Sequence, residues 1–120
     1  MRSKWIEHKS RKIFYQDFSG LHFNSDDIKS ELREVQAVVL AEPSNSVLAL
    51  SDFRDTHVDH HLLSDLNASS RATKQHLRKT AVLGITGVKR TLADLLSALT
   101  GLPLKYFDDI ESAKNWLVEK

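Results

Sequence analysis

The stretch Ser46-Val-Leu-Ala-Leu-Ser51 decides the fold class predicted for this chain. Its central residues are all apolar, with no alternating polar side chains, as in an interior strand of a parallel sheet that is buried on both faces. A second apolar run, Thr80-Ala-Val-Leu-Gly-Ile85, has the same character. Apolar residues repeat at helical spacing before and after each run, and this alternation predicts parallel strands joined by right-handed crossovers.

The remaining elements are predicted from β-favouring runs, from helical apolar spacing and from capping residues. Two strands joined by a short polar link predict a hairpin at the start of the chain, and Asp108 and Glu111 have the spacing of a capping box before the closing helix. The second helix is expected to fray into the polar stretch 69–75. We predict strands at 5–8, 12–18, 46–51, 80–85 and 104–107, and helices around 25–40, 58–66, 88–99 and 110–117.

The order of these elements, ββαβαβαβα, predicts an α/β fold with a mixed, mostly parallel sheet of about five strands and four helices. Its 120 residues, 41% of them hydrophobic, suffice for one core, so we expect a single domain over 1–120. No room is left for a separate catalytic domain.

The amino-acid composition also limits the kinds of molecule that this chain is expected to bind. The chain has 17 Lys and Arg residues and 16 Asp and Glu residues, which gives a net charge of +1. So small a net charge produces no strong electrostatic field that would attract nucleic acid or an anionic membrane. Cysteine is absent, which excludes disulfides and thiolate nucleophiles. No apolar run approaches the roughly 20 residues of a membrane span. We therefore expect a soluble, cytoplasmic protein that is not transmembrane.

Four segments carry a family resemblance. They read Ile13-Phe-Tyr-Gln-Asp-Phe-Ser-Gly-Leu21, Val47-Leu-Ala-Leu-Ser-Asp-Phe53, Ala81-Val-Leu-Gly-Ile-Thr-Gly87 and Tyr106-Phe-Asp-Asp-Ile-Glu-Ser-Ala-Lys-Asn-Trp-Leu117. Over nearly the whole chain this pattern resembles a SpoIIAA-like bacterial family of the STAS superfamily, which includes anti-sigma-factor antagonists and is related in shape to CRAL-TRIO lipid-binding domains. The resemblance implies a mixed sheet with helices and a role in binding partners or small ligands.

One departure from the family concerns regulation. Phosphorylation-switched antagonists carry Asp-Ser-Ser-Gly-Leu at the start of the helix after the central strand, whereas this chain reads Asp52-Phe-Arg-Asp-Thr-His-Val-Asp-His-His-Leu62. Thr56 is the only hydroxyl near the expected acceptor position, and the neighbouring Asp52, Asp55 and Asp59 would repel a phosphate there. We therefore predict a helix-capping role for Thr56 rather than a phosphorylation switch.

The same segment is the predicted contact surface for a protein partner. An exposed Phe53 beside charged residues would suit a contact patch. The leading hypothesis is a non-enzymatic regulatory or protein-interaction module. Its partner-contact or switch loop would comprise Asp52, Phe53, Asp55, Thr56 and His57.

The alternative is a small-ligand or lipid-binding domain with an anion site between the fourth strand and the next helix. Backbone N–H groups at Gly84, Thr86 and Gly87 could hold a carboxylate or phosphate, aided by Lys89 and Arg90. A purely structural interpretation is also open, in which Thr86 caps the helix while the glycines allow a tight turn and close packing.

Metal binding is not predicted. His57 and His61 are spaced to share one helix face, with His60 beside them, and such a pair can chelate a divalent metal. A third ligand could come from Asp52 or Asp55, but no His-Glu-x-x-His pattern is present and no general base is specified. A solvated polar face is the expected role.

The sequence motifs of catalysis, cofactor binding and nucleic-acid binding are absent. There is no Gly-x-Ser-x-Gly elbow and no Walker A sequence, so we predict neither an enzyme nor a cofactor. The basic residues before the fourth strand have no interleaved aromatics, which favours a solvated surface over a nucleic-acid site. Both a monomer and a homodimer stay open. The basic residues are Arg71, Lys74, Arg78 and Lys79.

Overall fold

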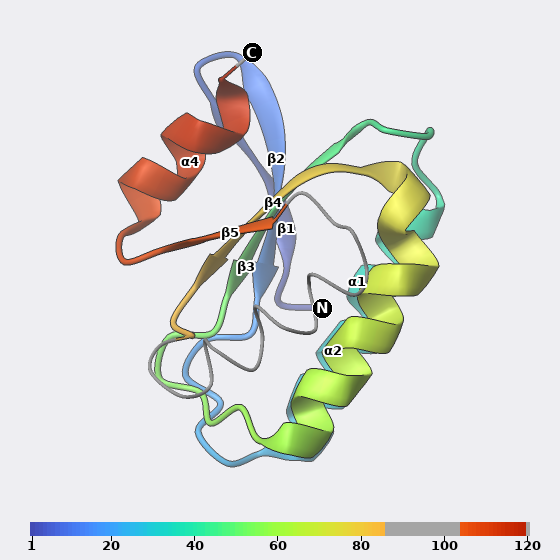
Figure 1. Ribbon diagram of the computed structural model, residues 1–120, viewed down its shortest axis with the longest axis vertical. Helices are drawn as coiled ribbons and strands as arrows, with labels where there is room; N and C mark the ends of the chain where they lie inside the picture. The colour runs from blue at the N-terminus through green and yellow to red at the C-terminus, as the bar shows by residue number, and fades with distance from the viewer. Residues whose placement is uncertain (86–103, 120) are drawn as a thin grey trace.

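A five-stranded sheet with strand order β1-β2-β3-β4-β5 forms the centre of the computed structural model, which describes residues 1–85 and 104–119 (Figure 1). β1 and β2 pair antiparallel as the predicted hairpin, and every later neighbour pairs in parallel. The predicted mixed, mostly parallel sheet is therefore confirmed. The strands are β1 Lys4–His8, β2 Arg11–Asp17, β3 Val47–Asp52, β4 Leu77–Leu83 and β5 Leu104–Phe107.

Helices cover both faces of the sheet (Figure 1). The described helices are α1 Ser25–Leu40, α2 His60–Thr73 and α4 Ile110–Val118, and a 3₁₀ turn at Lys74–His76 follows α2. α1 and α2 pack side by side on one face, and α4 packs on the other. The predicted helix at 88–99 lies outside the described residues. No helix in the described ranges is long and apolar enough to span a bilayer.

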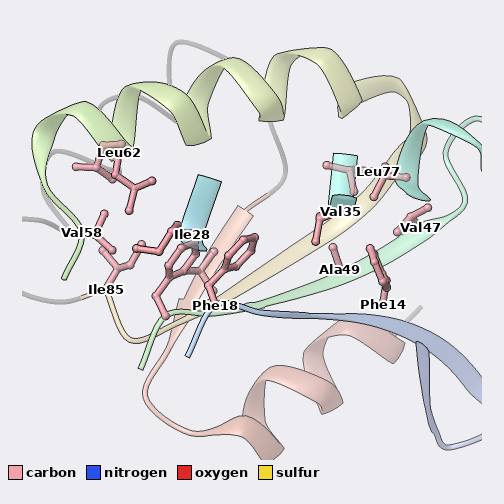
Figure 2. Packing of buried hydrophobic residues seen from close by; sticks show 14 residues of the cluster. Phe14, Phe18, Ile28, Val35, Val47, Ala49, Val58, Leu62, Leu77 and Ile85 are labelled. Atoms are coloured by element: carbon pink, nitrogen blue, oxygen red, sulfur yellow. The ribbon is translucent and has the colours of Figure 1, made fainter. Parts of the chain in front are cut away.

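Side-chain alternation along the strands divides the core into two layers. Phe14 and Ala49 point toward α1 and α2, where Figure 2 shows them with Phe18 and Val35 between the sheet and the helices. Ile13 packs on the α4 face with Leu50 and Leu117, among other residues. All six residues of β3 are buried, as the apolar run predicted for an interior parallel strand.

Two predicted helix boundaries are corrected. α2 does not fray at residues 69–75, because Thr73 is buried and its hydroxyl donates to the carbonyl of Ser69 at 2.9 Å. At the closing helix the N-cap is Asp109, which accepts from the backbone N of Ser112 at 2.8 Å. The predicted capping box of Asp108 and Glu111 is therefore wrong by one residue.

β4 begins at Leu77, earlier than predicted, and this changes the role of Lys79. Its ammonium donates to the carbonyls of Trp116 and Glu119, each at 2.8 Å, and lies 4.9 Å from the centre of the Trp116 ring. A cation is favourable at these carbonyls because they are the negative end of α4. Lys79 thus anchors the end of α4 to the sheet and is not part of a solvated basic surface.

Glu31 anchors the segment before β1 to α1. Its buried carboxylate accepts from the Ser3 hydroxyl at 2.6 Å and from the backbone N of Arg2 and Ser3 at 2.8–3.1 Å. Burial by itself would raise the pKa of Glu31, but the hydrogen bonds from Ser3 and Arg2 lower it below the ordinary value.

Glu31→Gln is expected to lower the free energy of unfolding by about 1–3 kcal/mol at pH 7, since charge-assisted hydrogen bonds are lost. Because the folded pKa is depressed, this stability is present above the unfolded pKa of about 4.3 and is lost as pH falls through the folded pKa. Urea unfolding of the wild type and Glu31→Gln at pH 7 and pH 3 measures this difference in the free energy of unfolding. Glu34→Gln, on the exposed side of the same helix, should change stability by less than about 0.5 kcal/mol. Equal losses in the two variants would contradict the anchoring role.

Candidate functional site

The chain segments that follow β2 and β3 form one cross-linked surface, which we call the loop platform and define as residues 18–24 and 53–59. His22 and Thr56 pair as an isolated parallel bridge. The backbone N of His57 donates to the carbonyl of His22 at 2.6 Å, and the N of His22 donates to the carbonyl of Asp55 at 3.1 Å. Both His22 and Asp55 have positive φ, 50° and 58°. The two loops are therefore held in a specific, partly strained conformation.

Thr56 joins the two loops instead of capping a helix. Its hydroxyl donates to the carbonyl of Phe18 at 2.5 Å and accepts from the backbone N of Leu21 at 3.1 Å. α2 begins only at His60, and its N-cap is Asp59, which accepts from the backbone N of Leu62 at 2.8 Å. The predicted capping role of Thr56 is wrong because the helix starts later than the sequence pattern indicated.

The aromatic residue exposed on the platform is Phe23, not Phe53. Phe53 is only 3% exposed, because its backbone N continues the sheet by donating to Leu83 at 2.9 Å and its ring stacks on Phe18 at 4.8 Å. The predicted contact role of Phe53 is therefore wrong. Phe23 is 79% exposed, and its ring lies 4.6 Å from that of His57.

Sequence reasoning missed Phe23 for a physical reason. It directly precedes Asn24, the N-cap of α1, whose side chain accepts from the backbone N of Asp27. An apolar residue in this position suits a hydrophobic staple, in which it would pack against the first turn of the helix. That pattern indicates a structural role, so only the structure shows that the ring is exposed.

Asp52 is fully buried at the end of β3 and is saturated with hydrogen bonds. Its carboxylate accepts from the Tyr15 hydroxyl at 2.6 Å, from the backbone N of Arg54 at 3.0 Å and from the Arg54 guanidinium at 2.7–3.2 Å. The predicted contact role of Asp52 is therefore wrong, because the inward-facing side chain supports the platform from below. Asp55 and His57 of the predicted loop do lie on the surface.

The pKa shifts in this cluster follow from the same contacts. Burial alone would raise the pKa of Asp52, but hydrogen bonds from Arg54 and Tyr15 lower it. Burial and the bond to Asp52 raise the pKa of Tyr15 to about 12. The bond to Asp52 also raises the pKa of Arg54. At neutral pH the cluster thus contains a carboxylate, a guanidinium and a neutral phenol.

The histidines do not form the predicted helical pair. α2 begins at His60, so His57 lies outside the helix and does not share a helix face with His61. Among the residues that the structure describes, no group of three or more His, Asp or Glu side chains is arranged to hold a metal ion.

Gly84 follows β4 and lies against the loop platform. Its φ is +87°, and a Cβ on this residue would lie 2.5 Å from the carbonyl carbon of Phe53 and also against the backbone N of Arg54. Close packing against the backbone of the loop after β3 therefore requires glycine here, whereas the predicted packing of this turn on the following helix lies outside the described residues. Thr86, Gly87, Lys89 and Arg90 of the predicted anion site lie outside the described residues, so that site stays a prediction.

Comparison with known proteins agrees with this architecture. A family model described as SpoIIAA-like matches residues 17–118. The fold is similar to the crystal structure of an uncharacterised protein with a SpoIIAA-like fold from Shewanella loihica PV-4. The two structures superpose with a TM-score of 0.71 and share 13% sequence identity. The match covers 96% of this chain and 91% of that one. No curated protein matches the sequence. The resemblance in the strand segments is thus confirmed, and the chain belongs to the SpoIIAA-like family.

Proposed function

We propose that this chain is a non-enzymatic regulatory module that binds a protein partner through the loop platform. One observation carries the proposal, namely that the Phe23 ring is 79% exposed on a surface whose backbone is fixed by cross-loop hydrogen bonds. Aromatic side chains, phenylalanine among them, are enriched at the centre of protein interfaces relative to the rest of the protein surface.

The rigidity of the platform supports a binding role. Thr56 bonds the loop after β2 through Phe18 and Leu21, while the backbone of His57 bonds that of His22. A surface that is ordered before binding loses less conformational entropy when a partner docks. The strained backbone at His22 and Asp55 persists only because these contacts hold it.

The surroundings of Phe23 have the character of an interface rim. His22, Asp55 and Asp59 are exposed polar residues on the platform, and the ring of His57 lies beside that of Phe23. An apolar centre with a polar edge is the usual composition of protein interfaces. Family membership adds support, because the anti-sigma-factor antagonists that this chain resembles act by binding proteins.

A comparative pull-down tests this function. Immobilised wild-type protein, Phe23→Ala and Leu40→Ala are incubated with lysate of the source organism, and captured proteins are quantified by mass spectrometry. Leu40 is the matched control, because it is an apolar residue 43% exposed at the far end of α1. We expect Phe23→Ala to reduce capture of a specific protein at least about tenfold, as for an interface hot spot, and Leu40→Ala to leave it unchanged.

Circular dichroism of the three proteins provides the folding control. Phe23 contributes little buried area, so its replacement should change stability by no more than about 0.5 kcal/mol. If every protein retained by the wild type is retained equally by the folded Phe23→Ala variant, the proposed contact surface is wrong.

A further inference from the structure

A cavity of about 100 Å³ lies between the α1–α2 pair and the sheet, separate from the exposed surface of the loop platform. Its floor comes from β2, β3, β4 and β5, and its roof comes from the two helices. Apolar side chains form much of its wall, including Val35 and Val39 from α1, Leu63 and Leu66 from α2, and Val82 from β4.

Polar side chains also lie in the floor of this cavity, and besides Tyr106 of β5 they come from three adjacent strands. They are Gln16 of β2, Ser51 of β3 and Thr80 of β4, and all three are buried. Gln16 and Ser51 are opposite each other in the parallel register, and the Ser51 hydroxyl donates to Gln16 Oε1 at 2.7 Å. Buried polar groups of this kind are normally fully hydrogen-bonded.

Thr80 is the exception. This residue is only 8% exposed, and its hydroxyl has no hydrogen-bond partner among the described residues. Thr73 lines the same cavity, but its hydroxyl donates to the carbonyl of Ser69. A buried hydroxyl with no protein partner leaves its hydrogen-bonding capacity open to the occupant of the adjoining space, either an ordered water or a ligand that displaces it.

The charge of the lining defines the class of this molecule. Among the described lining residues there is no Asp, Glu, Lys, Arg or His. Burying an ionised ligand there would leave its charge without a counter-ion, which is strongly unfavourable. A neutral molecule with an apolar body and hydrogen-bonding capacity matches a lining of apolar and uncharged polar side chains.

We propose that this cavity is a binding site for a small, uncharged, ring-sized molecule whose polar group bonds the Thr80 hydroxyl. The volume of about 100 Å³ is smaller than the roughly 150 Å³ of an engineered cavity that accepts benzene, so a single ring is the upper limit for the ligand. The site differs from the predicted anion site after β4, because it selects against charge. It also does not depend on the partner-binding role of the loop platform.

An NMR titration with three probes of equal ring size tests the proposal. Phenol, benzene and benzoate are added separately to ¹⁵N-labelled wild-type protein, Thr80→Val and Ser64→Ala. Ser64→Ala is the control, because it removes an exposed hydroxyl from α2 away from the cavity lining. We expect phenol to shift the amides around the cavity, such as those of Leu63 and Val82, and benzoate to bind at least tenfold more weakly.

Thr80→Val keeps the side-chain shape and removes the hydroxyl. It should lower phenol affinity about tenfold and leave benzene affinity unchanged, while Ser64→Ala should change neither. Without ligand, Thr80→Val should raise the melting temperature, because an unsatisfied polar group is removed, whereas Thr73→Val should lower it. Phenol shifts confined to other surfaces, equal phenol affinity in Thr80→Val, or a lowered melting temperature for that variant would each overturn the proposal.

Discussion

Gly84→Ala is expected to lower the free energy of unfolding by about 3 kcal/mol or more, a large effect for the addition of a single methyl group. Two penalties combine. A residue with a Cβ is strained at φ +87°, which costs roughly 1–2 kcal/mol. The new Cβ would also press on backbone atoms of Phe53 and Arg54, which cannot move aside as a flexible side chain could. Chemical denaturation measures the loss.

Gly20 provides the matched control for this prediction. It also has a positive φ, +67°, but no atom lies within 4 Å of the position of its Cβ. Gly20→Ala should therefore incur only the backbone strain of roughly 1–2 kcal/mol. The difference between the two losses in free energy of unfolding measures the cost of pressing a Cβ at residue 84 against the backbone of the loop platform. Equal losses would show that Gly84 does not hold these segments together.

Asp52→Ala is expected to reduce the free energy of unfolding by about 2–3 kcal/mol at pH 7, the cost of losing buried, charge-assisted hydrogen bonds. Removing the carboxylate takes the hydrogen-bond acceptor from the Tyr15 hydroxyl and from Arg54, but the Arg54 side chain is 47% exposed, so water solvates its guanidinium in the variant. Asp52→Asn preserves the shape and should cost less. Urea unfolding at several pH values measures both.

The pH dependence gives an independent check. The folded pKa of Asp52 is depressed, so its charge stabilises the protein above the unfolded pKa of about 3.9, and this stability is lost as pH falls through the folded pKa. The stability gap between wild type and Asp52→Asn should be constant from about pH 5 to pH 8 and should narrow below about pH 4. A gap that did not change with pH would contradict an ionised, hydrogen-bonded Asp52. Asp65→Asn, an exposed carboxylate on α2, should have a much smaller effect at every pH.

Most of the fold could be predicted from local patterns. The run at 46–51 has no polar alternation, and β3 is buried on both faces as a result. The apolar repeat at 25–40 with Asn24 before it marks α1 with its observed bounds. Such signals involve residues close in the chain, so they can be recognised before the tertiary structure is known.

The site was harder to predict because its contacts join residues far apart in the chain. Thr56 finds its partners on Phe18 and Leu21, and no local pattern indicates that these two loops meet. Phe53 looks like an exposed loop residue but continues the ladder of β3 next to Leu83. Asp52 has the sequence context of a surface loop, yet its acceptor role depends on Tyr15 in the neighbouring strand.

The central claim is that a protein partner contacts Phe23 on the loop platform. The most direct measurement places a photo-crosslinking phenylalanine analogue at position 23, and in a second variant at position 40, in cells of the source organism. We predict a covalent adduct with one cellular protein from position 23 and none from position 40, whose side chain is also exposed. No adduct from position 23 in a folded protein, or the same adducts from both positions, would contradict the claim.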